Sequence, residues 1–193
     1  MPKRRGEWME PVVRVGVTVT FLRMDHAPTA RAPDLPPTMG VIRLAAPTVA
    51  FYRYLYNTVG ADYVWWLRRT MPDRELAALL RDRAVSIHVL YSDGEPAGFY
   101  ELDRRTWPDT NLSYFGLLPH AVGTGVGFAF LRKAVDEAWR EGVTGMTVNT
   151  CTADHPRAMP AYVRAGFHTV RQARELWSVP VRLGLKIPGH LRT

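Results

Sequence analysis

Apolar residues recur along the chain with two periods, and these separate the expected strands from the expected helices. β-Branched residues alternate over Val15–Leu22, as in a strand with one buried face. From residue 85 onward strand-like runs dominate, and the turn Ser92–Pro96, with Asp-Gly at its centre, joins two of them into a hairpin. The expected strands are Val15–Leu22, Val41–Leu44, Val85–Tyr91, Ala97–Leu102, Leu112–Leu118, Val143–Thr150, Phe167–Arg171 and Leu176–Val179.

Apolar residues three and four positions apart predict helices between these strands. Pro47 opens a helix over Thr48–Thr58, and Pro72 opens a second one. Two more are expected at Val126–Glu141 and Pro156–Ala165. Hairpins and strand–helix units are mixed, which predicts an α/β (α+β) fold with a mixed sheet and helices on its faces, not a doubly wound one.

The composition is that of a globular protein. The chain has 193 residues, 47% of them hydrophobic, which fits one domain with at most a small appendage. Cys151 is the single cysteine, so no internal disulfide can form. The apolar run Val12–Val19 is interrupted by Arg14 and Gly16, and no stretch is long and apolar enough for a transmembrane helix. We therefore expect a cytoplasmic protein that does not bind a membrane.

The formal net charge of +7 is concentrated at the two ends of the sequence. Residues 1–5 carry +3 and residues 171–193 carry +4, so residues 6–170 sum to zero. A neutral body without a recognisable DNA- or RNA-binding motif argues against a nucleic-acid partner.

A glycine-rich segment, His120–Gly127, lies between an expected strand and an expected helix. Its alternate glycines, Gly123, Gly125 and Gly127, let backbone N–H groups turn toward one point at the positive end of the helix dipole, which suits a pyrophosphate. Taken alone, such glycines are also typical of a tight turn. No Gly-Lys-Ser/Thr follows, which excludes a P-loop, and Phe128 stands where a dinucleotide-binding fingerprint has its third glycine.

Two blocks of this sequence together resemble the GNAT superfamily of N-acetyltransferases. Leu118-Pro119 followed by Val122–Gly127 resembles motif A, in which a strand and a Pro precede Gln/Arg-Gly-x-Gly-x-Gly/Ala and a helix. Asp154–Phe167 is similar to the family block Asn-x-x-Ala-x-x-x-Tyr-x-x-x-Gly-Phe. The resemblance covers about residues 41–171 and implies a mostly antiparallel sheet of six to seven strands with helices on both faces. Residues 1–40 would then form an N-terminal strand and proline-rich arm, and residues 172–193 a basic C-terminal extension.

The resemblance implies that acetyl-CoA is the co-substrate. It implies that the loop holds the pyrophosphate, whereas the backbone of Leu117 and Leu118 holds the pantetheine arm and the thioester carbonyl. The loop residues concerned are Val122, Gly123, Thr124, Gly125, Val126 and Gly127. Val122 replaces the usual Gln or Arg, and His155 replaces the Asn that contacts the coenzyme arm. His155 is expected to make that contact or to move a proton, or else to be only a cap or loop residue.

The resemblance also assigns catalytic positions. Tyr162 matches the family tyrosine that protonates the leaving thiolate, although its position equally fits a core aromatic. Glu101 is the best candidate for the general base, because it alternates with apolar neighbours and could point into the cleft; the alternative is a solvent-facing residue. Asp154 and His155 are the other candidates for the base.

The acceptor pocket is expected from the aromatic and basic region 52–70 and from the loop near 104–114. Arg53 is a candidate for binding a carboxylate of the substrate. Asp62 is a candidate for a cationic amine, and Tyr114 for a substrate contact.

Two functions stay open on these residues. The first is an N-acetyltransferase that moves acetyl from acetyl-CoA to a primary amine of a small molecule or peptide by direct attack. The second is a catalytically weak GNAT-fold protein that binds acyl-CoA or another ligand, which Val122, His155 and the lack of an acid in Asn111–Leu118 favour. No metal site is expected, and the segments outside 41–171 could pack on a second chain to form a homodimer.

Overall fold

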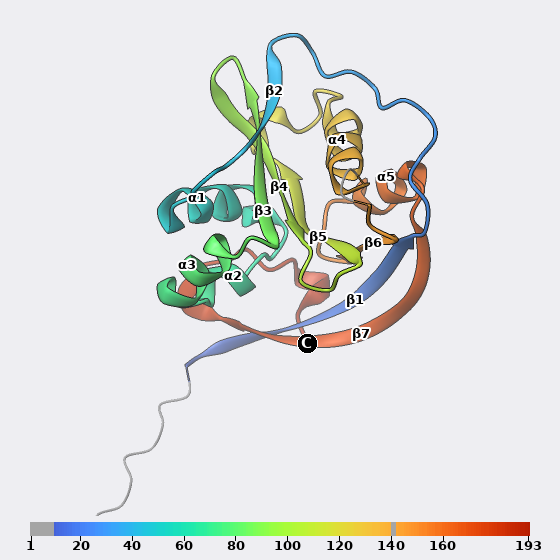
Figure 1. The fold of residues 1–193 in the computed structure, drawn as a ribbon. Coiled ribbons are helices and arrows are strands. Elements are labelled where there is room, and N and C mark those ends of the chain that lie inside the picture. The colour runs from blue at the N-terminus through green and yellow to red at the C-terminus, as the bar shows by residue number, and fades with distance from the viewer. Residues whose placement is uncertain (1–9, 140–141) are drawn as a thin grey trace, which may run out of the picture.

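Seven strands form one sheet in the computed structural model, which describes residues 10–139 and 142–193 (Figure 1). Their order is β2-β3-β4-β5-β6-β1-β7, with β5 and β6 parallel and the other neighbours antiparallel. The strands are β1 Val12–Met24, β2 Met39–Arg43, β3 Val85–Ser92, β4 Glu95–Asp103, β5 Asp109–Leu117, β6 Gly145–Cys151 and β7 His168–Pro180. The helices are α1 Val49–Val59, α2 Leu67–Thr70, α3 Asp73–Arg81, α4 Gly127–Trp139 and α5 Ala158–Ala165.

Helices cover both faces of the sheet, which confirms the predicted fold class (Figure 1). The alternation of side chains along each strand explains the two layers. In β4, Tyr100 and Leu102 pack in the cluster under α4 and α5, whereas Phe99 packs in the cluster under α1 and α3. Strand β4 is therefore apolar on both faces.

Strand β1 lies inside the sheet, between β6 and β7, although it comes first in the sequence. Its pairing with β7 runs from Val12, opposite Pro180, to Arg23, opposite His168. A third apolar cluster joins this pair of strands to the C-terminal tail; its buried members are Val15, Val17, Val19, Val64, Ala153, Val179, Ile187 and Leu191.

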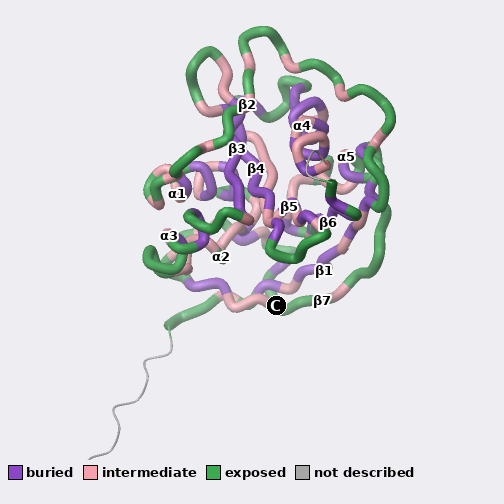
Figure 2. Tube along the Cα trace, in the orientation of Figure 1, coloured by how far each residue is buried: buried purple, intermediate pink, exposed green. Residues whose placement is uncertain are grey.

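Strand β7 is one continuous strand where the sequence pattern predicted two short ones. Most of β7 is exposed at the edge of the sheet (Figure 2), so its residues show no apolar alternation, and pairing with β1 supplies the order. β7 also runs across the boundary expected at residue 171. The predicted end of the long helix at Glu141 lies outside the described residues, and so does the basic segment 1–5.

Strands β5 and β6 pair only at one end. The parallel ladder joins Asp109–Leu112 to residues 145–148, and beyond Val148 strand β6 pairs with β1 alone. Residues 113–117 of β5 therefore present an open edge toward β6. The strands thus separate beside the loop before α4.

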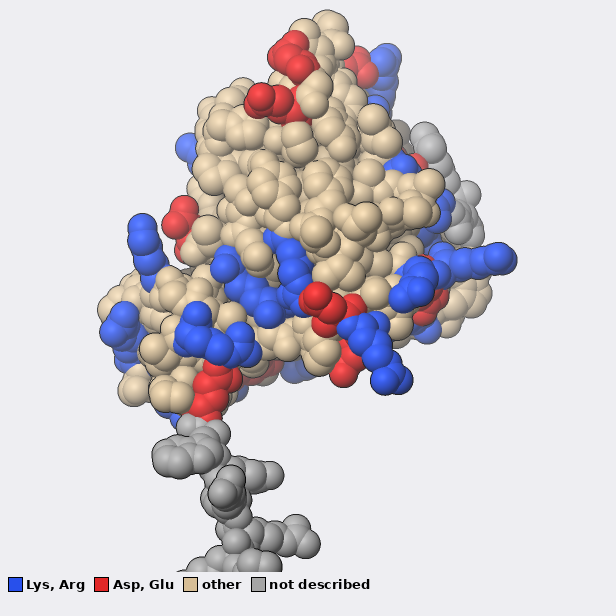
Figure 3. Space-filling view, turned by 90° about the vertical axis from the view of Figure 1, so that its left-hand side faces the viewer, with Lys and Arg blue, Asp and Glu red and all other residues tan. Residues whose placement is uncertain are grey.

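Side chains of both charges are interleaved on the face that carries α1 and α3 (Figure 3). Basic groups form a band across the lower half of this view with acidic groups among them, whereas the middle of the upper half is nearly uncharged; near the top lie a few acidic groups and a basic one. Among the described residues, no helix combines the length and apolar character needed to cross a membrane.

The buried His88 should make stability depend on pH. His88 stacks on Tyr100, and burial, with smaller contributions from Arg43 and Arg104, lowers its pKa to about 4. The unfolded chain takes up this proton near the ordinary pKa of about 6.5, whereas the folded chain takes it up only near pH 4, so stability falls as pH falls between these values. Between pH 7 and pH 4, His88 should lower the wild-type free energy of unfolding by about 3 kcal/mol, and His88→Gln should abolish that decrease in urea unfolding. His26→Gln, which removes an exposed imidazole, should leave the profile in place; a wild-type slope in H88Q contradicts the prediction.

Candidate functional site

A cavity of about 960 Å³ opens where β5 and β6 separate. Residues of β5 and β6 line its middle, and the loop before α4 together with α5 lines one end. The segment between α1 and α3 lines the other end. The cavity therefore joins the segments that carry most of the candidate residues.

The loop before α4 forms a cradle of unpaired backbone N–H groups. Gly123 and Gly125 have φ of 85° and 91°, which other residues rarely adopt, and a Cβ on either would meet nothing within 4 Å. No backbone or side-chain acceptor in the described chain takes the N–H groups of residues 123–126, and the first turn of α4 adds further free ones. Such a set of N–H groups at a helix N-terminus fits a pyrophosphate.

The side chains of this loop divide into two groups. Val122, 40% exposed, lines the cavity with the backbone of Gly123, Gly125 and Gly127. Thr124 and Val126 do not line it: the Thr124 hydroxyl donates to the Ala121 carbonyl (2.8 Å), and Val126 is buried in the core. Sequence reasoning missed Phe128 and Arg164, which line the same end with the guanidinium 3.9 Å from the ring centroid.

The open edge of β5 offers Leu117 to the cavity but not Leu118. The N–H of Leu118 donates to the Ala97 carbonyl (2.8 Å), its carbonyl accepts from Ala121 (2.9 Å), and its side chain is buried. Because N–H groups alternate sides along a strand, the N–H of Leu117 points the other way, into the gap beside β6.

Tyr162 lies on α5 and lines the cavity near the loop. Its ring packs edge-on against Phe167, with centroids 5.9 Å apart. Burial, with a smaller contribution from the charge of Asp154, raises the pKa of the Tyr162 phenol well above its usual value. Tyr162 is therefore protonated at neutral pH and can donate a proton into the cavity.

Asp154 is the one carboxylate among the described residues that line the cavity. One of its oxygens accepts from the Cys151 N–H (2.8 Å) and the Thr150 hydroxyl (2.9 Å), and the other accepts from Trp65 Nε1 (3.4 Å). All three donors are neutral, so they orient the carboxylate without neutralising it. Together with burial, its charge raises the pKa of the Cys151 thiol to about 12, which leaves that thiol protonated.

His155 lines the cavity next to Asp154, with its ring edge-on to Tyr63 at 6.0 Å. The backbone N–H of Arg157 donates to His155 Nδ1 (3.0 Å). A neutral imidazole that accepts at Nδ1 carries its proton on Nε2. His155 therefore presents a hydrogen-bond donor, which fits a contact with the coenzyme arm better than the role of a base.

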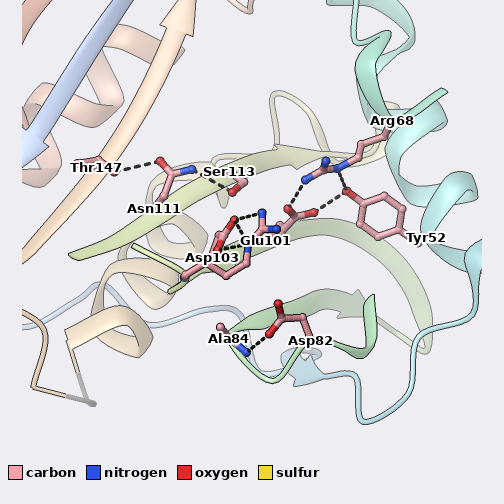
Figure 4. Close-up of polar contacts among 10 residues, drawn as sticks. Tyr52, Arg68, Asp82, Ala84, Glu101, Asp103, Asn111, Ser113 and Thr147 are labelled. Atoms are coloured by element: carbon pink, nitrogen blue, oxygen red, sulfur yellow. Dashed lines mark hydrogen bonds and ion pairs between the residues drawn. The ribbon is translucent and has the colours of Figure 1, made fainter. Parts of the chain in front are cut away.

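Glu101 does not reach the cavity; the predicted base lies behind Arg68 and Tyr52 (Figure 4). Its side chain is fully buried, one oxygen accepts from Arg68 Nη2 (2.7 Å), and the other accepts from the Tyr52 hydroxyl (2.5 Å). Arg68 Nε also donates to the Tyr52 hydroxyl (3.3 Å), which fixes the guanidinium on the cavity wall. Glu101 thus positions Arg68. The sequence shows Glu101 only as an acid within a strand and carries no signal that Arg68 would be its partner.

Arg53 does not line the cavity either. Its guanidinium donates to the carbonyls of Arg68 (2.6 Å) and Met71 (2.7 Å), and it pairs with Asp73 (2.6 Å). Its donors hold the backbone at the end of α2 and the carboxylate at the start of α3, so the structure assigns it a structural role instead of the expected substrate contact. Asp62 is likewise absent from the cavity lining.

Three aromatic rings form the wall next to Arg68, and Tyr114 is one of them, as expected. Tyr56, Trp65 and Tyr114 lie within 4.9–5.3 Å of one another between ring centroids, and Arg68 packs 5.2 Å from the Tyr114 ring. The backbone before Trp65 is unusual: Val64 has a φ of 57°, which is strained for a β-branched residue. Gly60 makes room for this turn, since a Cβ there would lie 2.3 Å from Trp65 Cβ.

Loss of the Glu101 charge should lower the free energy of unfolding more than loss of the more exposed ion pair that Asp103 of the same strand makes with Arg105. Glu101→Gln leaves Arg68, which is 13% exposed, without its counter-charge, and we expect the free energy of unfolding to fall by about 3–5 kcal/mol. Asp103→Asn breaks the more exposed pair with Arg105 and should cost less than about 1 kcal/mol. Urea denaturation of both variants measures the difference, and equal losses contradict the positioning role.

Comparison with known proteins identifies the family. The model of the "Acetyltransferase (GNAT) family" matches residues 52–167. No curated protein sequence matches the chain.

Solved structures share the fold at low sequence identity. A GCN5-related N-acetyltransferase from Sphaerobacter thermophilus is 16% identical, covers 89% of this chain and has a TM-score of 0.58. One from Kribbella flavida is 17% identical, with the same coverage and TM-score. This chain spans only 53% and 63% of the lengths of those two proteins.

A shorter neighbour is an aminoglycoside acetyltransferase from an uncultured soil metagenomic sample. It is 14% identical, covers 66% of this chain and 87% of its own, and has a TM-score of 0.54. Identities this low show a common fold and nothing about the substrate. The family model, in contrast, matches more than half of the sequence, and the matched part includes the glycine loop and Tyr162. The chain therefore belongs to the GNAT acetyltransferase family.

Proposed function

We propose that this protein is an acetyl-CoA-dependent N-acetyltransferase that acetylates the primary amine of a small molecule or peptide by direct attack. One observation carries the proposal: a single cavity joins a cradle of free N–H groups to a proton donor and to an unneutralised carboxylate. Acetyl-CoA, when bound, supplies the acetyl group as a thioester.

The residues present fit that co-substrate. The N–H groups of residues 123–126 would hold its pyrophosphate, with Arg164 beside them, and Val122 removes only a side-chain contact. The N–H of Leu117 would donate to the thioester carbonyl and stabilise the negative charge that develops there. His155 Nε2 would donate to the coenzyme arm.

Asp154 and Tyr162 would handle the two protons of the reaction. The Asp154 carboxylate binds the incoming ammonium and accepts a proton as the amine becomes nucleophilic, and the proton passes to solvent. Tyr162 donates its phenol proton to the departing thiolate. Both side chains line the same cavity, and the Asp154 charge contributes to the raised pKa of Tyr162, so the two groups interact electrostatically.

The binding-protein alternative rests on the open edge of β5, which presents no acidic side chain to the cavity. It predicts coenzyme A binding without release of thiol from acetyl-CoA above background. The enzyme proposal predicts thiol release that depends on an amine.

The glycine loop can be tested by a pair of matched variants. Gly125→Ala forces a side chain into a backbone with φ of 91°, and Gly94→Ala does the same at φ of 88° in the distant β3–β4 turn. Neither Cβ meets an atom within 4 Å, so both variants should lose a similar stability of about 1–2 kcal/mol. Only Gly125→Ala should weaken coenzyme A binding in calorimetry, by about tenfold or more for a loss of ~1.4 kcal/mol. Equal affinities of G125A and G94A contradict the proposed pyrophosphate site.

Tyr162→Phe tests the proton donor. We expect kcat to fall by about 100-fold, the lower end of general acid catalysis, while the Kd for coenzyme A changes less than twofold. Tyr54→Phe removes a hydroxyl from a tyrosine that is 48% exposed outside the cavity and should keep wild-type kcat. An unchanged kcat in Y162F, measured by thiol release, excludes Tyr162 as the acid.

A further inference from the structure

Aromatic side chains are the largest group in the lining of the acceptor end of the cavity. Besides the wall of Tyr56, Trp65 and Tyr114, three further rings line it: Tyr63 and Trp66, which flank Trp65 in the sequence, and Trp177 of β7. The strained backbone at Val64 and the close approach of Gly60 to Trp65 hold part of this lining in place. A preformed wall of flat rings favours a ligand with a flat apolar body.

The charges at this end admit one ammonium and oppose a second. Asp154 supplies the single lining carboxylate of the described chain, and Trp65 both donates to it and belongs to the aromatic wall. An ammonium held by Asp154 therefore lies in the part of the cavity that aromatic side chains line. The other charged groups that line the cavity are guanidinium groups: Arg68 on the acceptor wall and Arg157 and Arg164 on α5 and its N-terminal side.

Polyamines and aminoglycosides carry several ammonium groups, and each needs an anion or water. In the described lining of this cavity a second ammonium would find no second carboxylate, only neutral side chains and guanidinium groups such as that of Arg68, whose counter-charge Glu101 does not line the cavity. We propose that the acceptor is a monocationic primary amine with an aromatic or other flat apolar body, such as an arylalkylamine. This inference rests on the proposed function, because it names the amine that occupies the same site.

A panel of three amines tests the substrate class with the full chain and acetyl-CoA. We compare 2-phenylethylamine, one charge with a ring, with ethylamine, one charge without a ring, and with spermidine, a trication. We expect kcat/KM for thiol release to be at least tenfold higher for 2-phenylethylamine than for either of the others, because burial of a ring contributes roughly one to two orders of magnitude. A kcat/KM for spermidine or ethylamine that equals the value for 2-phenylethylamine overturns the inference and leaves the proposed acetyltransferase intact.

Three variants locate the effect. Tyr63→Leu should reduce the preference for 2-phenylethylamine over ethylamine by about tenfold, because it removes a ring from the lining. Asp154→Asn should raise KM for 2-phenylethylamine by at least tenfold without changing the Kd for coenzyme A. Tyr54→Leu, outside the cavity, is the matched control and should keep the wild-type preference. An unchanged preference in Y63L, or an unchanged KM in D154N, contradicts the proposed placement.

Binding separates this inference from the proposed function. Trp65, Trp66 and Trp177 line the cavity, so tryptophan fluorescence follows amine binding without turnover. We expect 2-phenylethylamine to bind at least tenfold more tightly than spermidine. That result without thiol release from any amine supports the inference and rejects the enzyme, whereas equal or reversed affinities overturn the inference even if thiol is released.

Discussion

The early separation of β5 from β6 is the constraint on which the site depends. Beyond Val148, where the β5–β6 ladder ends, the backbone of residues 113–117 has no strand partner on that side, and buried backbone groups need one. A ligand in the gap can supply it, and the N–H of Leu117 is aimed there. The glycine loop continues the same row of free donors into the N-terminus of α4. Under the proposed function the co-substrate would be bound mainly by backbone groups, which would account for Val122 at the start of the loop.

Residues outside this gap hold in place the side chains that line the cavity. Arg53 donates to the backbone carbonyl of Arg68 and so fixes the position of its backbone, while Glu101 and Tyr52 hold its guanidinium. Asp154 holds the turn after β6 and reaches Trp65 in the segment after α1. Ion pairs and hydrogen bonds of this kind hold the two walls of the cavity in register, so the acceptor end is shaped before a substrate arrives.

Local patterns in the sequence predicted most of the fold. The hairpin, the helices of the body and the layered mixed sheet follow from periods that each segment carries by itself. The strand β7 was predicted in two pieces, because its order comes from β1, more than a hundred residues away, and its exposed faces show no alternation. The site divides in the same way. Short motifs pointed to Tyr162 and the glycine loop, which line the cavity, and Tyr114, a candidate without a motif, lines it too. Glu101 and Arg53 do not line it, because their partners, Arg68 and Asp73, are set only by packing.

The position of β1 has a consequence for folding during synthesis. This strand is made before the other six described strands, yet its neighbours β6 and β7 are the last two of the seven. Its valines therefore stay without their final partners until β6 and β7 have been made, which is the situation of a protein rich in contacts between distant segments. The sheet is complete only when β6 and β7 have paired with β1, and the cavity wall at Val19 is complete only then.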